Sequence, residues 1–244
     1  MFLASLKLKT VRLERQVMSA YTFEDVAVVM GTYNEQQAIG TVLDDIDRVT
    51  SGKASVVCVD SSSDRTPEIA REKGARVIEQ EPQGYGVAVE RALRAADRPV
   101  VVTTDCDDTY PMDRLPDFLD AINDGADVVS GDRLSGGAEA MPRFNRLGNR
   151  LFAVLASLLL DRPVRDTTTG MRAYRKRVIE DIEWTENTGL SAELLLRPLS
   201  RGYDVREIEI AYGDRAGETT LDPISGGAEI AGSILRVGVQ ERRR

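Results

Sequence analysis

Two aspartates that are separated by one residue, Asp105 and Asp107, follow the apolar run PVVVTT at residues 99–104. Carboxylates at the end of a buried strand would repel each other and lose hydration unless a cation neutralised them. Mg²⁺ and Mn²⁺ prefer such oxygen ligands, and Mg²⁺ usually binds through one or two carboxylates together with substrate phosphates. The alternative is an acidic loop that precedes the next helix. The pair alone supports both interpretations equally.

A third carboxylate, Asp60, ends another strand-like run, SVVCVD at residues 55–60. A carboxylate at such a strand end is well placed to bind a ribose hydroxyl or a base. The alternative is that Ser63 or Asp64 caps the helix that follows, with Pro67 in its first turn. The two interpretations are compatible because they use different side chains.

Several kinds of chemistry are excluded by what the sequence lacks. The chain has no histidine, which excludes histidine-ligated zinc, histidine triads and histidine general bases. Neither G-x-G-x-x-G after the first strand nor G-x-x-x-x-G-K-[ST] occurs, which argues against Rossmann dehydrogenases and P-loop proteins. Gly84 and Gly86 precede a predicted helix and would let the backbone approach a phosphate or a base, a signal of low specificity.

Strands and helices alternate in the part of the chain that must position these residues. Strands are predicted at residues 26–30, 55–60, 75–80, 99–105 and 126–132, and helices at residues 38–49, 66–74, 86–97 and 113–124. Several of the strands are apolar without alternation, as strands covered on both faces are. This alternation of strands and helices predicts an α/β fold with a mostly parallel, doubly wound sheet and helices on both faces. Ligands bind beyond the carboxyl ends of the strands in such sheets.

The second half of the chain is less regular. We predict a helix at 141–160, a strand and a short helix within 171–182, and then a helix at 189–201, a strand at 204–212 and a final helix at 226–240. Two glycine-rich stretches, 135–137 and 213–217, are predicted to be loops. The expected organisation is an N-terminal extension (1–25), one large domain (26–221), and a C-terminal helix with a basic tail (222–244).

The composition is that of a globular protein. Of 244 residues, 42% are hydrophobic and 30% are charged, which suffices for one large core. The net charge of −8 argues against a nucleic-acid partner. An acidic surplus with few lysines is typical of halophilic proteins, and an ordinary acidic cytoplasmic protein is the alternative. Cys58 and Cys106 stand in apolar runs, which predicts buried thiols in a reducing compartment.

Six short motifs occur in an order and approximate spacing that resemble the GT-A-type inverting glycosyltransferases of family 2. They are TYNE (32–35), VDSSSDRT (59–66), GYG (84–86), TTDCDDTYP (103–111), GDR (131–133) and DTTTGMRAY (166–174). Within that group the chain is most similar to the dolichyl-phosphate-mannose synthases and other polyprenyl-phosphate hexosyltransferases. The resemblance covers residues 26–221, and it implies a GT-A fold with a nucleotide-binding half (26–132) and an acceptor half (133–221).

The resemblance implies an activity. A hexose would pass from a nucleoside-diphosphate sugar of the UDP-glucose or GDP-mannose type to dolichyl or polyprenyl phosphate, with inversion and with Mg²⁺ or Mn²⁺. The product would feed protein glycosylation or other glycan assembly at the cytoplasmic face of the cell membrane. An acceptor phosphate is already an anion and needs no general base, which accounts for the absence of histidine.

The resemblance also implies roles for individual residues. The nucleoside would contact Tyr33, Glu35 and Asp60, and the metal and diphosphate would contact Asp105 and Asp107. Arg215 would close over the donor phosphates. The acceptor phosphate would face Arg133, Arg143, Arg146 and Asn149, so the expected catalytic residues are Asp107, Arg133 and Arg146. Glu193 matches an acceptor-side carboxylate that would act as a base, an orienting group or a solubilising residue of its helix.

Three positions depart from the family pattern. They are Ser61, where a second aspartate is frequent, Thr109, where glutamine is frequent, and Thr220, where lysine is frequent. These departures leave the third metal ligand and part of the phosphate neutralisation unassigned. They do not affect the central pair of aspartates.

The helix at 143–160 bears on the acceptor. Arg143, Arg146 and Arg150 share one face and precede the apolar run LFAVLASLLL. The run is too short to span a bilayer, for which ~20 residues are needed, but a basic amphipathic helix can lie in the membrane surface. The alternative is a core helix with a solvated basic edge.

Three other functions remain open at this point. A transferase of the same fold with a soluble hydroxyl acceptor would need Glu193 or Asp166 as a base. A nucleotidyltransferase would also use strand-end carboxylates and Mg²⁺. The third is a catalytically inactive binding domain. If Asp166 is not a base, it either holds the acceptor loop by hydrogen bonds or serves as a turn residue.

Overall fold

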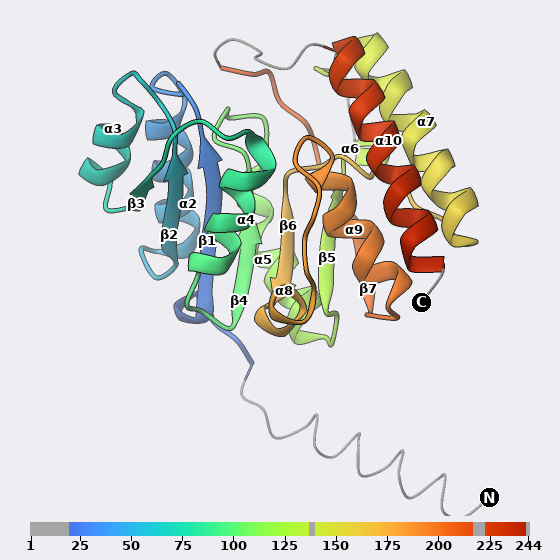
Figure 1. The fold of residues 1–244 in the computed structure, drawn as a ribbon. Coiled ribbons are helices and arrows are strands. Elements are labelled where there is room, and N and C mark those ends of the chain that lie inside the picture. Colours follow the sequence, from blue (N-terminus) through green and yellow to red (C-terminus); the bar gives the residue numbers. More distant parts are fainter. Residues whose placement is uncertain (1–19, 137–139, 217–222, 243–244) are drawn as a thin grey trace, which may run out of the picture.

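The computed structural model describes residues 20–136, 140–216 and 223–242 (Figure 1). Most of the predicted N-terminal extension and the last two residues of the basic tail lie outside the described residues. So does Thr220. Two short 3₁₀ helices, η1 (Phe23–Asp25) and η2 (Met112–Arg114), are part of the described chain.

A seven-stranded sheet forms the centre of the molecule, in the order β3-β2-β1-β4-β6-β5-β7. All neighbouring strands are parallel except at β6, which runs antiparallel to both β4 and β5. The prediction of a mostly parallel sheet is therefore confirmed. The strands are β1 (Val26–Thr32), β2 (Ser55–Asp60), β3 (Arg76–Glu79), β4 (Val100–Thr103), β5 (Val128–Asp132), β6 (Arg172–Arg175) and β7 (Val205–Glu209).

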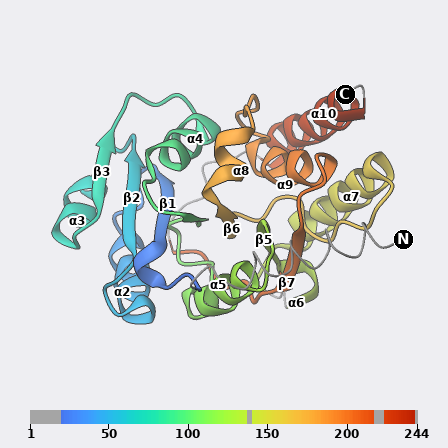
Figure 2. The same ribbon diagram turned by 90° about the horizontal axis from the view of Figure 1, so that it is seen from below.

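Helices cover both faces of this sheet, as Figure 2 shows from below. Successive residues of β1 point to opposite sides: Val28 packs in the core beneath α2 and α5, and Val29 packs in the core beneath α4 and α9. Because both faces are covered, the strands need no polar side, which explains their unbroken apolar runs. The helices are α2 (Ile39–Thr50), α3 (Thr66–Glu72), α4 (Tyr85–Ala95), α5 (Leu115–Asn123), α8 (Lys176–Asp181) and α9 (Leu190–Ser200).

Two long helices, α7 (Arg143–Leu160) and α10 (Pro223–Arg242), lie side by side at one end of the sheet and pack on α9 (Figures 1 and 2). They approach closely at Gly238, where a Cβ atom would lie 2.9 Å from Leu159 Cδ1. Arg242 donates to the carbonyl oxygens of Leu158 and Leu159, at 3.0 and 2.6 Å, and so occupies acceptors that the end of α7 leaves open. The pair forms a unit attached to the sheet through α9.

Some boundaries differ from the predictions. β4 ends at Thr103, so Asp105 and Asp107 lie in the turn beyond the strand. The helix predicted from residue 141 begins at Arg143, directly after Pro142. The predicted loop at 135–137 is wrong for Ser135 and Gly136, because α6 (Arg133–Gly136) continues β5 as a short helix; residue 137 lies outside the described residues. Glycine is needed at the end of α6, since a Cβ at Gly136 would clash with the backbone of Ile210.

The prediction of buried cysteine thiols is confirmed, and two glycines end helices. Gly74 and Gly125 have positive φ angles of 84° and 108° and follow α3 and α5, where a left-handed residue ends a helix. Cys58 and Cys106 are free and buried. No helix among residues 20–136, 140–216 and 223–242 is long and apolar enough to cross a membrane.

Candidate active site

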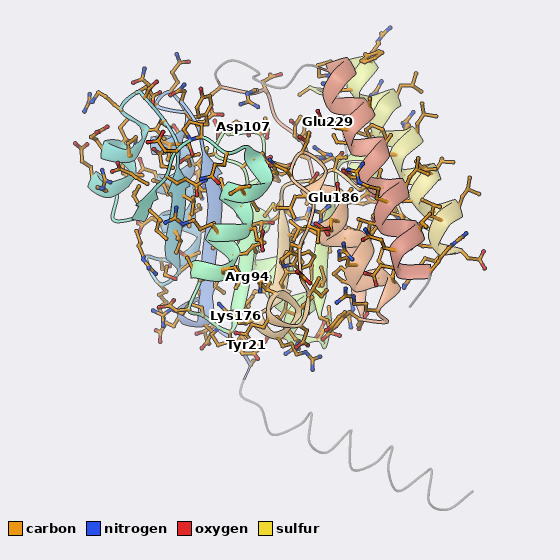
Figure 3. The ribbon with its side chains drawn as sticks, in the orientation of Figure 1. Tyr21, Arg94, Asp107, Lys176, Glu186 and Glu229 are labelled. Carbon is orange, nitrogen blue, oxygen red and sulfur yellow. The ribbon has the colours of Figure 1, made fainter. Side chains whose placement is uncertain are left out.

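The site lies at the carboxyl ends of β1, β2 and β4, which run parallel and therefore end at the same edge of the sheet. Asp107 lies at this end of the molecule in Figure 3, and Tyr21 and Lys176 lie at the opposite end. Beyond Thr103 the chain turns across the edge, with Asp108 in a left-handed conformation (φ 64°). The turn places both predicted metal ligands where ligands of such sheets bind.

Arg215 joins two of the strand ends. Its Nη1 donates to Asp107 Oδ2 at 2.8 Å, and its Nη2 donates to Glu35 Oε1 at 2.6 Å. The other oxygen of Asp107 accepts from the backbone N–H and the hydroxyl of Thr109, at 3.2 and 2.6 Å. The structure thus brings together three residues that the sequence predicts for donor and metal binding. It also gives Thr109 a role, as the residue that orients Asp107.

Asp105 lies beside the first residue of α4. Its Oδ1 accepts from the hydroxyl of Tyr85 at 3.1 Å. Its other oxygen lies close to Gly170, where a Cβ atom would be only 2.5 Å from Oδ2, so a larger residue would displace the carboxylate. Burial, and after it the negative charge of Asp107, raise the pKa of Asp105 to about 6. The carboxylate is therefore short of positive charge.

The carboxylate of Glu35 is likewise short of nearby positive charge. Burial raises the pKa of Glu35 to about 7; Arg215 lowers it, and Asp107 and Asp105 raise it further. No group of three or more histidine, cysteine, aspartate or glutamate side chains that could hold a metal occurs in the described part of the chain. Two neighbouring aspartates, of which Asp105 has no ion pair among the described residues, suit a hard divalent cation that completes its shell with phosphate oxygens and water. The donor set therefore fits Mg²⁺ or Mn²⁺.

Asp60 is buried at the end of β2 and fixes the neighbouring strand end. Its carboxylate accepts from the hydroxyls of Thr32 and Ser62, at 2.6 and 2.7 Å, and from the N–H of Ser62 at 3.0 Å. The predicted capping by Ser63 or Asp64 is not found at the N-cap, which is Arg65 and has no side-chain capping bond. Asp64, one residue earlier, accepts from the N–H of Thr66 at 2.9 Å. Tyr33, at the end of β1, is exposed beside this edge.

Arg133 is engaged inside the protein. It is buried, and it forms a bidentate pair with Asp166 through Nε and Nη2 at 2.7 and 2.9 Å. Nη2 also donates to Thr168, and the guanidinium lies over the ring of Tyr212. The assignment of Arg133 to an acceptor phosphate stays a prediction. The observed role of Arg133 is to hold the loop that carries Asp166.

The same pair answers the question about Asp166. Burial alone would raise the pKa of this carboxyl, but the charge and hydrogen bonds of Arg133 hold it below its usual value. A carboxylate that is stabilised in this way is a weak base. Asp166 also accepts from the N–H of Thr168 at 3.1 Å, which is the bond of a turn residue, so the structure supports both loop holding and the turn role rather than the role of a base.

Arg143, Arg146 and Asn149 occupy the first turns of α7. Arg143 is exposed, and the other two are partly exposed. Asn149 Nδ2 lies 3.4 Å from Met141 Sδ. No hydrogen bond within the described ranges joins these three side chains to the strand-end carboxylates. Their assignment to the acceptor therefore stays a prediction.

Comparison with known proteins identifies the family. The model of Glycosyl transferase family 2 matches residues 27–183, which include the strand-end carboxylates, Arg133 and Asp166. The chain belongs to this family. Family membership confirms the predicted resemblance and sets aside the nucleotidyltransferase alternative.

Two relatives of the family 2 transferase are named for transfer to dolichyl phosphate. It is 70% identical over 227 residues to the dolichyl-phosphate hexose transferase of Haloferax volcanii, a match that covers 93% of this chain and 100% of that protein. It is 29% identical over 210 residues to the dolichol-phosphate mannosyltransferase of Pyrococcus furiosus, a match that covers 80% of this chain and 59% of that protein.

Solved structures confirm the predicted GT-A fold. Glucosyl-3-phosphoglycerate synthase from Mycobacterium tuberculosis, in complex with Mn²⁺, UDP and glucosyl-3-phosphoglycerate, matches with a TM-score of 0.70 over 92% of this chain and 85% of that chain. The sequence identity is 20%. A mycobacterial protein of 20% identity matches with a TM-score of 0.75. At this identity the likeness concerns the fold alone.

The structure corrects the role of Glu193 in the family 2 transferase. Glu193 is buried, so it does not solubilise α9. Its oxygens accept from the backbone and hydroxyl of Thr185, from the N–H of Glu186 and from Arg197. A carboxylate engaged by three residues is not open to an acceptor. The sequence pattern misleads here because Thr185 and Glu186 lie on the loop before α9. Arg197, the third partner, lies on α9 and is itself held by Glu241 and Gln240 of α10.

Sequence reasoning also missed Tyr85. The sequence predicts that Gly84 and Gly86 let the backbone approach a ligand, but in the family 2 transferase both glycines lie against Asn187. The side chain between them is the one that touches the site, through Asp105. The available signal was a tyrosine at the start of a helix that follows a strand of the same sheet.

Proposed function

We propose that the protein transfers a hexose from a nucleoside-diphosphate sugar to dolichyl phosphate or another polyprenyl phosphate, with inversion and with Mg²⁺ or Mn²⁺ as cofactor. Donors of the UDP-glucose or GDP-mannose type fit this role. The product would feed protein glycosylation or other glycan assembly at the cytoplasmic face of the cell membrane. Similarity to the Haloferax dolichyl-phosphate hexose transferase over its whole length supports the choice of acceptor.

The exposed apolar face of α7 is the observation that carries this proposal. Five large side chains along one side of the helix are 56% to 71% exposed: Phe144, Leu147, Leu151, Val154 and Leu158. Ala153 and Ala156, on the other side, are buried, and Ala156 is part of the core beneath the helix. An exposed apolar stripe of this size indicates an interaction surface. This surface, which we call the α7 stripe, fits an acceptor that is held in a membrane.

Charge agrees with that assignment. Arg143 and Arg150 are exposed on the same helix as the α7 stripe, and no acidic side chain occurs between residues 143 and 160. Arginines beside an apolar helix face favour the surface of an anionic membrane, in which the helix lies without crossing. Contact through the α7 stripe would bring the first turns of α7, with Arg143 and Arg146, to the level of lipid phosphates.

On the donor side, Asp105 and Asp107 would hold the cation, which supplies positive charge opposite the leaving diphosphate. Arg215 lies between Asp107 and Glu35. It is placed to exchange these carboxylates for donor phosphates, which a guanidinium binds in a bidentate manner. Asp60 and Tyr33, at the neighbouring strand ends, would line the nucleoside site.

On the acceptor side, the chemistry needs alignment more than proton transfer. A phosphate oxygen is an anion and attacks the anomeric carbon without a general base. Neither carboxylate proposed as a base is open, because Glu193 and Asp166 are both engaged by arginines. Positioning and electrostatic stabilisation then supply most of the rate enhancement. This favours a phosphate acceptor over a hydroxyl acceptor.

The test is to incubate the purified protein with UDP-glucose or GDP-mannose, Mn²⁺ and dolichyl phosphate, and to measure the sugar extracted with the lipid. We expect lipid-linked sugar from wild type and from Asp113→Asn, an exposed control, and at least about 100-fold less from Asp107→Asn. The proposal is overturned if the protein glycosylates only a soluble hydroxyl acceptor, such as a glycerate, or only hydrolyses the donor.

A further inference from the structure

A chain of hydrogen bonds runs from Asn187 through the backbone beside Tyr85 to Asp105, which the proposed function makes a metal ligand. Tyr85 donates its hydroxyl proton to Asp105 Oδ1 at 3.1 Å. Asn187 lies on the loop before α9. Both the oxygen and the nitrogen of its side-chain amide form hydrogen bonds with the backbone on either side of Tyr85. Its Oδ1 accepts from the N–H of Gly86 at 2.9 Å, and its Nδ2 donates to the carbonyl of Gln83 at 2.9 Å.

The glycines on either side of Tyr85 leave the space that Asn187 occupies. A Cβ atom at Gly84 would lie 2.5 Å from Asn187 Nδ2, and one at Gly86 would clash with the backbone of Asn187. Gly84 also has a φ of 97°, which residues with side chains rarely adopt. The GYG motif therefore places a tyrosine between two points at which the loop grips the start of α4.

The loop that carries Asn187 is itself held firmly. Glu193 of α9 accepts from the backbone N–H groups of Thr185 and Glu186. The carboxylate of Glu186 in turn binds Ser233 and Arg236 of α10, the latter at 2.6 and 3.1 Å. In Figure 3, Glu186 lies beside α10, lower in the view than Asp107 and well above Tyr21. The loop therefore holds Asn187 in a fixed position beside Tyr85.

From this geometry we infer that Asn187 is a positioning residue for the metal site: it fixes Tyr85, and the Tyr85 hydroxyl orients the Asp105 carboxylate toward the cation. Hydrogen bonds to a ligating carboxylate set its direction, and their loss commonly lowers metal affinity about 10- to 100-fold. The inference rests on the proposed function, because it takes Asp105 to be a metal ligand.

The chain offers a matched control in Asn123. Its amide binds the backbone of Tyr21 in the same two-ended way, accepting from the N–H at 2.8 Å and donating to the carbonyl at 3.0 Å. Tyr21 lies at the end of the molecule opposite to Asp107. Asn123→Ala therefore removes an equivalent backbone contact without touching the metal site.

The experiment measures Mn²⁺ binding by the electron paramagnetic resonance signal of free Mn²⁺, with saturating UDP or GDP, whichever raises the melting temperature more. We expect Tyr85→Phe and Asn187→Ala each to weaken Mn²⁺ binding about 10-fold. Asn123→Ala should bind Mn²⁺ as wild type does. Because Asn187 acts through Tyr85, Asn187→Ala should cost nothing further in the Tyr85→Phe background.

Three outcomes would overturn the inference. Unchanged Mn²⁺ binding in both single variants would remove the positioning role and leave the proposed function intact. Full additivity in the double variant would show that Asn187 acts by a route other than Tyr85. Absence of Mn²⁺ binding in wild type would remove the metal site itself, and the inference with it.

Discussion

At the scale of single residues, the site is defined by how its charges are paired. Asp105 has one neutral hydrogen-bond donor, Tyr85, whereas Asp107 is bound by Thr109 and Arg215. Arg215 is 29% exposed and reaches over the strand ends, so its contacts can be exchanged for those of a ligand. Arg133 and Asp166, by contrast, are both buried and bind each other. Arg215 is therefore placed where a ligand could reach it, whereas Arg133 is bound within the framework.

Replacement of Arg215 should therefore act on the donor. Arg215→Ala is expected to lower kcat/KM for the nucleotide sugar about 10- to 100-fold, because hydrogen bonds to charged groups contribute about 1.5–3 kcal/mol. Steady-state kinetics with varied donor would measure it. Arg114→Ala removes an exposed ion pair with Asp117 and should leave the kinetics unchanged. Equal kinetics for the two variants would refute the donor role of Arg215.

Replacement of Asp166 should act on stability. Asp166→Asn leaves the buried guanidinium of Arg133 without its charge partner, which is expected to cost about 3–5 kcal/mol. The folded pKa of Asp166 is below its unfolded value, so its contribution is present above pH ~4 and is lost as pH falls through the lower, folded pKa. Urea unfolding of wild type and variant should therefore differ most near neutral pH and converge in acid. A gap that is constant from pH 7 to acid would contradict this.

Residue roles were predictable from the sequence only where neighbours in the chain decide them. Asp105 and Asp107 could be placed because a strand leads straight into them. The burial of Glu193 could not, since its partner Thr185 lies on a loop and Arg197 is itself held by α10. The spacing of carboxylates along the chain does not reveal which of them meet an arginine in space.

At the scale of elements, α7 is the clearest case of a helix with two apolar sides. Its inner side packs on α9 and α10, and its outer side is the α7 stripe. The sequence predicts this helix from its periodicity, but it offers a core helix and an interfacial helix as alternatives. The exposure of the outer side in the structure favours the interfacial one. The antiparallel direction of β6 is another feature that the local pattern does not contain.

The α7 stripe should bind membranes. Leu151→Glu is expected to weaken binding to vesicles that contain phosphatidylglycerol about 10- to 100-fold, because burial of a leucine side chain contributes about 1.5–3 kcal/mol. Asn145→Glu, which adds the same charge at an exposed position of the same helix, should have a smaller effect. Vesicle sedimentation would measure both. Identical binding of Leu151→Glu and wild type would show that the α7 stripe serves another partner.

At the scale of the whole molecule, the sheet edge, the loop with Arg215 and the α7–α10 pair make one enzyme of glycosyl transferase family 2. Sequence patterns were sufficient for the fold class, since alternating strands and helices dictate a mostly parallel sheet. Ligand binding should stabilise this molecule as a unit. At a nucleotide concentration about 100 times Kd, the gain is about 2.7 kcal/mol, or about 5–10 °C in Tm for a chain of this size.

That stabilisation is expected from UDP or GDP together with Mn²⁺, and it should largely disappear when EDTA removes the metal. Thermal unfolding with and without each component would measure it. A shift of the same size with nucleotide and EDTA would contradict a metal held between the donor diphosphate and the aspartates.

The bond in the product tests the central claim most directly. We expect the hexose to be joined through its anomeric carbon to the phosphate of the polyprenyl lipid, with a configuration opposite to that in the nucleotide sugar. Nuclear magnetic resonance of the purified lipid product would show the carbon–phosphorus coupling of a glycosyl phosphate and the inverted anomer. A retained anomer, or a sugar attached to anything other than the lipid phosphate, would contradict it.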